Sequence, residues 1–137
     1  ILSRYNCIYI EGYLLVNEEL VRTTMQKAKK LGLKVALDLS NFNIVNAISG
    51  AEALNLAKTQ TFDIILMDIM MPKMNGIEAL RQLKEINGFD VPVVALTADA
   101  IEGQDEKYIQ AGFNDYLSKP IDRYQLNRVL NKFLGGK

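Results

Sequence analysis

Residues 62–67 form a short run, Phe-Asp-Ile-Ile-Leu-Met, that is almost wholly apolar and is followed directly by Asp68. A strand with apolar side chains on both faces is typical of a parallel sheet that is covered on both sides. A second such run spans residues 91–96 and is followed by Thr97. Because parallel strands need long crossover connections, the chain must return over the sheet between them. These runs therefore predict an α/β fold.

Amphipathic segments alternate with apolar runs along the whole chain. Further strands are predicted at residues 6–10, 34–39 and 115–118, and helices at residues 18–31, 49–58, 76–86, 102–111 and 122–134. Right-handed crossovers then imply a five-stranded parallel sheet with helices on both faces. Asp122 is expected to cap the last helix. Residues 42–45 fit either an extra strand or a loop.

The length and net charge of the chain limit its domain count and its range of binding partners. A chain of 137 residues suits a single domain spanning residues 1–137, and its 16 basic residues equal its 16 acidic ones. A neutral chain offers no field that gathers nucleic acid or anionic membrane, so we expect neither partner. The chain contains no histidine, so it can neither carry a phosphohistidine nor build a histidine-based zinc site. We expect a monomer.

Three polar residues follow three separate predicted strands. Asp68, Thr97 and Lys119 stand where the carboxyl ends of parallel strands meet, which is the ligand-binding edge of such sheets. Together they suit phosphoryl transfer, with Asp68 as the nucleophile and with Lys119 and Thr97 offsetting charge on the phosphoryl oxygens. Each residue alone also has an ordinary interpretation: a helix cap, a strand-end residue and a surface lysine. Their combination favours the chemical one.

The motifs around these residues resemble those of response-regulator receiver domains. The segments are Asp-Ile-Met-Met-Pro-Lys-Met-Asn-Gly from Asp68, Ala-Leu-Thr-Ala around Thr97, and Asp-Tyr-Leu-Ser-Lys-Pro ending at Pro120. The resemblance covers residues 47–134 and implies a flavodoxin-like three-layer sandwich.

The resemblance also implies roles for particular residues. Asp68 would be the phosphorylated aspartate, Thr97 and Tyr116 the switch residues, and the Lys119–Pro120 bond would be cis. Plain packing is an equal alternative for Tyr116. A Mg²⁺ ion would be held by Asp68 and the backbone carbonyl of Met70. A histidine kinase or a phosphotransfer protein would be the partner if the receiver function survives.

The metal site departs from the family pattern. In the receiver domains that this chain resembles, the first strand ends with two adjacent acidic residues. Here Glu11 is followed by Gly12. Glu11 is a candidate for one of the two metal-binding acids, or is a surface acid. Gly12 cannot supply the other, and Asp38 near the end of the second strand is a weaker candidate. The resemblance therefore predicts weak Mg²⁺ binding.

Residues 5–46 resemble a strand-helix-strand fragment of a ribokinase-like sugar kinase, without that family's glycine-rich anion hole. Two resemblances in one chain lead to the hypothesis of an engineered chimera without selected activity, which keeps the phosphoacceptor aspartate but has an impaired metal site. The alternative is a working two-component receiver domain. We expect no independent turnover beyond Mg²⁺-dependent self-phosphorylation and dephosphorylation at Asp68. The parent domains would be cytoplasmic, and an engineered chain would be recombinant.

Overall fold

The computed structural model describes residues 7–11, 18–38, 61–71, 74–98 and 105–135. One parallel sheet contains the strands β1 (Cys7–Glu11), β2 (Lys34–Asp38), β3 (Ile64–Asp68), β4 (Val93–Thr97) and β5 (Asp115–Ser118). The helices are α1 (Glu18–Lys30), α3 (Gly76–Lys84), α4 (Asp105–Ala111) and α5 (Arg123–Leu134). The predicted five-stranded parallel sheet is confirmed. The predicted helix at 49–58 and the alternative strand at 42–45 lie outside the described residues.

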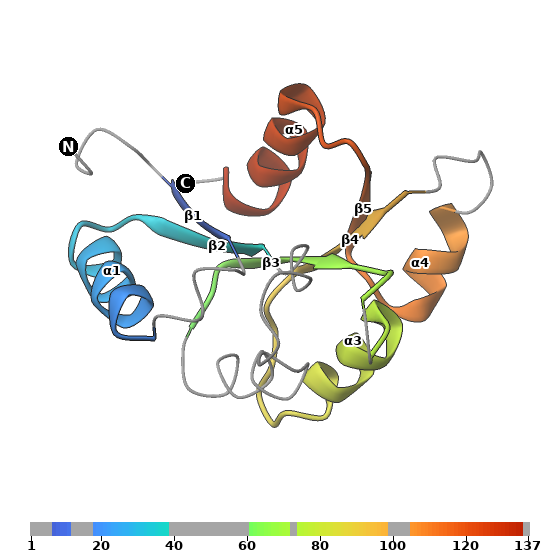
Figure 1. The fold of residues 1–137 in the computed structure, drawn as a ribbon, viewed down its shortest axis with the longest axis horizontal. Coiled ribbons are helices and arrows are strands. Elements are labelled where there is room, and N and C mark those ends of the chain that lie inside the picture. Colours follow the sequence, from blue (N-terminus) through green and yellow to red (C-terminus); the bar gives the residue numbers. More distant parts are fainter. Residues whose placement is uncertain (1–6, 12–17, 39–60, 72–73, 99–104, 136–137) are drawn as a thin grey trace.

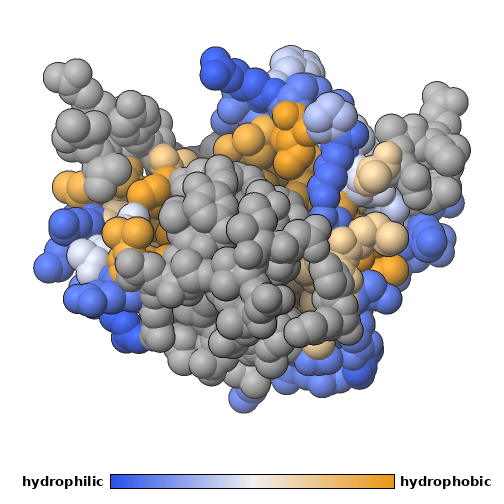
Figure 2. Space-filling model, in the orientation of Figure 1, coloured by the Kyte–Doolittle hydropathy of each residue, from blue (hydrophilic) through white to orange (hydrophobic). Residues whose placement is uncertain are grey.

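Two apolar clusters pack on the two faces of the sheet. The first joins α1, α3 and α4 to the sheet, through side chains such as Met25, Leu80 and Tyr108. The second lies under α5, through Val129 and the partly buried Leu126. Among the described helices, Figure 1 shows only α5 on one side of the sheet, and Figure 2 shows hydrophilic residues over its outer surface with apolar ones beneath. The predicted flavodoxin-like three-layer sandwich is therefore confirmed.

The central strands β3 and β4 are buried along their full length. Their side chains alternate between the two clusters, so that Ile65 contributes to the first and Leu66 to the second. Each such side chain contributes about 1.5–3 kcal/mol when it leaves water. A polar group in the middle of these strands would forfeit that gain, so polar residues collect at the strand ends.

The strand order is β1-β2-β3-β4-β5, whereas flavodoxin-like sheets commonly follow the order 2-1-3-4-5. In the common order the chain reverses direction after its second strand, and right-handed crossovers then put the first helix on the opposite face from the third and fourth. Here the strands advance in one direction, and α1 shares its face with α3 and α4. As a consequence β2, and not β1, lies beside β3.

Just before β3 and β5, a side-chain oxygen accepts a hydrogen bond from a backbone N–H of the adjacent strand. Asp63 precedes β3, and its Oδ2 accepts a hydrogen bond of 2.7 Å from the N–H of Val35 while its own N–H donates to the Val35 carbonyl. Asn114 precedes β5 and makes the same pair of bonds with Val93. These bonds explain why β3 begins at Ile64, two residues after the start of the predicted apolar run.

Asp115, the first residue of β5, is a buried carboxylate that α5 neutralises. Its Oδ1 accepts a hydrogen bond from the N–H of Tyr116, and its Oδ2 lies 2.7 Å from Lys132 Nζ and 3.5 Å from an Arg128 nitrogen. Burial raises the pKa of Asp115, but the bonds from Lys132 and Tyr116 and the charge of Arg128 outweigh it, so the pKa lies below its ordinary value. The network joins α5 to the sheet.

The variant Asp115→Asn should be less stable than the parent by about 1–2 kcal/mol near neutral pH, a range kept modest because Lys132 and Arg128 are half exposed. A depressed pKa in the folded state stabilises the fold above the unfolded pKa, and that stabilisation is lost as the pH falls through the folded value. The difference between the two proteins should therefore shrink in acid. Urea unfolding at about pH 7 and about pH 2.5 measures it.

The control is Asp122→Asn. Asp122 is exposed and caps α5, because its Oδ1 accepts a hydrogen bond from the N–H of Gln125, and asparagine caps helices equally well. An Asp115→Asn variant whose stability loss does not change with pH would contradict the assigned ion pairs.

Candidate functional site

Three functional candidates lie at the carboxyl ends of three adjacent strands. Asp68 is the last residue of β3, Thr97 is the last residue of β4, and Lys119 follows β5 directly. The Lys119 ammonium contacts Asp68 Oδ2, and the Lys119 backbone N–H donates to the Thr97 carbonyl over 2.7 Å. The Lys119–Pro120 peptide is cis, as predicted. The structure thus brings the three residues to one edge of the sheet.

Asp68 is a carboxylate almost removed from water, since its side chain is 8% exposed. Its Oδ1 accepts a hydrogen bond of 2.9 Å from the N–H of Met70, and its Oδ2 contacts the Lys119 ammonium. A buried charge requires such partners, because an isolated carboxylate in the interior is very costly. Lys119 is 34% exposed, so the pair lies at the border of solvent. A reactant can approach there.

Thr97 is buried and its hydroxyl lies toward α4. Thr97 is 3% exposed, and its Oγ1 lies 2.9 Å from the hydroxyl oxygen of Tyr108. Tyr108 is not a candidate in the sequence analysis, which predicts only that residues 102–111 form a helix. Tyr116 is half-buried on β5 and packs against the first apolar cluster. This position fits either a switch residue or plain packing.

The segment after Asp68 folds back onto the end of β3. The Ile69 N–H donates to the Leu96 carbonyl, and the Ile69 carbonyl accepts from the Gly76 N–H, both over 3.0 Å. A Cβ at Gly76 would lie 2.4 Å from the Asp68 carbonyl oxygen, which is a steric clash. Gly76 is therefore required where α3 begins. The sequence indicates only a turn and a helix start here.

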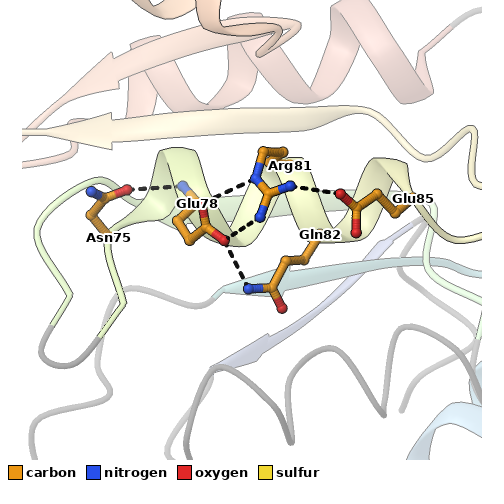
Figure 3. Close-up of polar contacts among 5 residues, drawn as sticks. All are labelled: Asn75, Glu78, Arg81, Gln82 and Glu85. Carbon is orange, nitrogen blue, oxygen red and sulfur yellow. Dashed lines mark hydrogen bonds and ion pairs between the residues drawn. The ribbon is translucent and has the colours of Figure 1, made fainter.

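A chain of polar contacts runs along α3, from its N-cap Asn75 to its C-cap Glu85 (Figure 3). Asn75 Oδ1 caps the helix by accepting from the Glu78 N–H, and Arg81 pairs with both Glu78 and Glu85. The hydrogen bond from Arg81, with a second one from Gln82, lowers the pKa of Glu78 to about 2. The Asn75 cap defines where α3 begins, whereas the Arg81 contacts lie within the helix and its C-cap.

The two candidate metal-binding acids lie on different strands. Glu11 ends β1 and is paired with Asp38, which ends β2. Asp38 is level with Leu66, two residues before Asp68, on the strand next to it. Because β2 intervenes, the backbone of Glu11 is two strand spacings, about 10 Å, to the side of β3. Of the two acids, Asp38 therefore has the backbone position nearer to Asp68.

The donor groups at this edge suit a small hard cation. Asp68 supplies a carboxylate, and Mg²⁺ commonly binds to one or two carboxylates while it keeps several water ligands. Within the ranges that the structure describes, no three His, Cys, Asp or Glu side chains cluster as a metal site. The Asp68 carboxylate itself is a donor of the type that Mg²⁺ prefers.

Residues 26–131 match the response regulator receiver domain family. Two-component system protein A of Emericella nidulans is 36% identical over 124 residues, which are 89% of this chain but only 17% of that protein. The chain thus spans a small part of that relative's length. No helix among the described residues is long and apolar enough to cross a membrane.

Two solved structures share the fold. The receiver domain of sensor histidine kinase PA1611 from Pseudomonas aeruginosa PAO1, with a magnesium ion coordinated in its active site cleft, is 35% identical with a TM-score of 0.57, over 93% of this chain and 95% of that one. The second is a chain from the co-crystal of the Saccharomyces cerevisiae histidine phosphotransfer signaling protein Ypd1 with the receiver domain of its downstream response regulator Ssk1. It is 26% identical, with a TM-score of 0.57, and the match covers 91% of this chain and 86% of that chain.

The chain belongs to the response regulator receiver domain family of two-component systems. The family match runs across the boundary between residues 46 and 47, and the fungal relative aligns over most of the chain. The comparisons give no support to a ribokinase-like fragment or to an engineered chimera, because no break in similarity falls at that boundary. They favour the alternative, a two-component receiver domain.

Replacing Gly76 by alanine should destabilise the protein by about 2–3 kcal/mol, because the new methyl group would overlap the Asp68 carbonyl. The control is Gly88→Ala, since Gly88 has open space around it and a φ of +79°. It should cost only the left-handed backbone penalty of about 1–2 kcal/mol. Urea unfolding compares the two variants. Equal losses would show that the segment after β3 moves freely away from Gly76.

Proposed function

We propose that this domain accepts a phosphoryl group on Asp68. The observation that carries the proposal is the Asp68–Lys119 contact at the strand edge next to Thr97. A carboxylate held by one backbone N–H and one ammonium is fixed in orientation at the border of solvent. Family membership supports this reading. The proposal treats residues 1–137 as one domain.

The proposed reaction is a displacement at phosphorus. An oxygen of Asp68 attacks the phosphorus of a phosphohistidine, the new P–O bond forms while the P–N bond breaks, and the leaving imidazole takes a proton from solvent. Lys119 offsets the negative charge on the phosphoryl oxygens, since its ammonium already lies against Asp68. Thr97 would donate its hydroxyl to the same group. Tyr116 would follow Thr97 in the switch.

A protein that carries a phosphohistidine is the proposed partner. The chain has no histidine of its own, so the phosphoryl donor must be supplied from outside this sequence. The co-crystal of Ypd1 with the Ssk1 receiver domain pairs a receiver domain with a histidine phosphotransfer protein, which supports a partner of this class. A histidine kinase is the second donor of the same chemistry.

Mg²⁺ is the proposed cofactor, as the PA1611 receiver domain coordinates magnesium in its active site cleft. Asp68, the carbonyl of Met70 and an acid at the neighbouring strand end would hold it. When bound, the ion supplies positive charge to the phosphoryl oxygens. The strand register favours Asp38 over Glu11 as that acid.

Beryllofluoride, a mimic of the phosphoryl group, should bind to the parent protein in the presence of Mg²⁺ and should not bind to Asp68→Asn, which lacks the nucleophilic carboxylate. Fluorine NMR reports the adduct directly. The matched control is Asp122→Asn, which changes an exposed aspartate on α5 and should keep the adduct. A parent protein that forms no adduct at saturating Mg²⁺ would refute the proposed function.

Asp38→Asn should weaken Mg²⁺ binding by about tenfold or more, since a hard cation loses a carboxylate ligand. Glu11→Gln should leave the affinity unchanged, because β2 separates Glu11 from the strand of Asp68. Calorimetric titration of each variant with Mg²⁺ measures both effects. The reverse result, a loss for Glu11→Gln alone, would put the cation against β1.

A further inference from the structure

Tyr108 is a core tyrosine whose polar end meets a functional residue. It lies on α4, is 4% exposed, and packs its ring edge-on against Phe113 with centroids 6.5 Å apart. Its hydroxyl lies 2.9 Å from Thr97 Oγ1. A buried tyrosine hydroxyl needs a partner, because an unsatisfied polar group in the interior is costly. Here that partner is the same hydroxyl that the phosphoryl group would engage.

Strand alternation places Thr97 and Asp68 toward opposite faces of the sheet. Thr97 follows Val93 and Ala95 at intervals of two, and both belong to the cluster under α3 and α4. Asp68 follows Ile64 and Leu66 in the same way, and both belong to the cluster under α5. Strand alternation thus puts the Thr97 side chain on the α4 face, where its hydroxyl meets that of Tyr108.

We propose that Tyr108 is a positioning residue that holds the hydroxyl of Thr97 against α4 while Asp68 is unphosphorylated. The inference rests on the proposed phosphoacceptor function. When Asp68 carries a phosphoryl group, Thr97 rotates about χ1 and exchanges the Tyr108 hydroxyl for a phosphoryl oxygen. Tyr108 then loses a buried hydrogen bond. Its hydroxyl therefore favours the unphosphorylated conformation and sets how strongly the domain resists activation.

Removing the hydroxyl by Tyr108→Phe keeps the ring that packs on Phe113 and removes what favours the unphosphorylated rotamer. Beryllofluoride should bind Tyr108→Phe about tenfold more tightly than the parent at saturating Mg²⁺, the factor expected for one buried hydrogen bond. Isothermal calorimetry measures it. The control Tyr124→Phe removes a hydroxyl from an exposed tyrosine on α5 and should bind like the parent.

The effect should depend on the Thr97 hydroxyl. In a Thr97→Val background, which lacks that hydroxyl, adding Tyr108→Phe should no longer tighten beryllofluoride binding. A general loosening of the fold by Tyr108→Phe would act in both backgrounds. Unchanged or weaker binding by Tyr108→Phe, or equal tightening in both backgrounds, would overturn the inference.

A second measurement needs no phosphoryl mimic. Three-bond NMR couplings of Thr97 report χ1, and the unliganded parent should show one rotamer, whereas Tyr108→Phe should show averaging over several. A single unchanged rotamer in Tyr108→Phe overturns the inference even if the domain accepts phosphoryl groups. Absence of the beryllofluoride adduct in the parent, with averaging in the variant, would refute the proposed function and keep Tyr108 as the residue that positions Thr97.

Discussion

The contact between Asp68 and Lys119 is the interaction on which the site depends. The interiors of β3 and β4 are wholly apolar, so the first places where a charge can lie are the strand ends. At the end of β3 the carboxylate remains mostly buried, and it is tolerated because an ammonium and a backbone N–H meet its two oxygens. The same apolar sheet that stabilises the fold therefore concentrates the reactive groups at one edge.

The order of the strands decides which acids can assist Asp68. With β2 beside β3, the carboxylate-bearing end of β2 is the nearer neighbour, and the end of β1 lies one strand further out. A sheet that advances in one direction also lacks the reversal of strand order at which ligands commonly bind in open α/β sheets. Binding at this edge must then rely on the strand-end side chains and the segment that follows Asp68.

Much of the site is local in sequence and could be predicted. Asp68 and Thr97 each follow an apolar run directly, and Lys119 follows the short predicted strand at residues 115–118. The cap at Asp122 is predictable for the same reason, since its side chain bonds three residues ahead. The family resemblance also predicted the cis peptide after Lys119.

What could not be predicted depends on contacts between distant segments. The position of β2 beside β3 follows from packing of whole elements, which apolar periodicity does not specify. The bond between Thr97 and Tyr108 joins a strand end to a helix, and the sequence predicts only that Tyr108 lies in that helix. The need for Gly76 arises because α3 starts against the backbone of Asp68, a distance that no sequence pattern contains.

Asp115 shows why a buried aspartate–lysine pair is not enough to identify a phosphoacceptor. Its side chain is 8% exposed, as is that of Asp68, and its two oxygens meet a backbone N–H and a lysine ammonium in the same way. The difference lies in the surroundings. Asp115 begins its strand under two cations from α5, which fix it as an anchor between helix and sheet.

Asp68 ends its strand, at the edge where the Thr97 hydroxyl and the exposed Met70 also lie. Its cation, Lys119, comes from the end of β5, two strands away, and is partly in solvent. In the proposed reaction, a phosphoryl group on Asp68 leaves the junction between helix and sheet intact, whereas a group added to Asp115 would have to break its ion pairs with α5. Location at the carboxyl edge, more than the pairing itself, is therefore what supports Asp68 as the proposed phosphoacceptor.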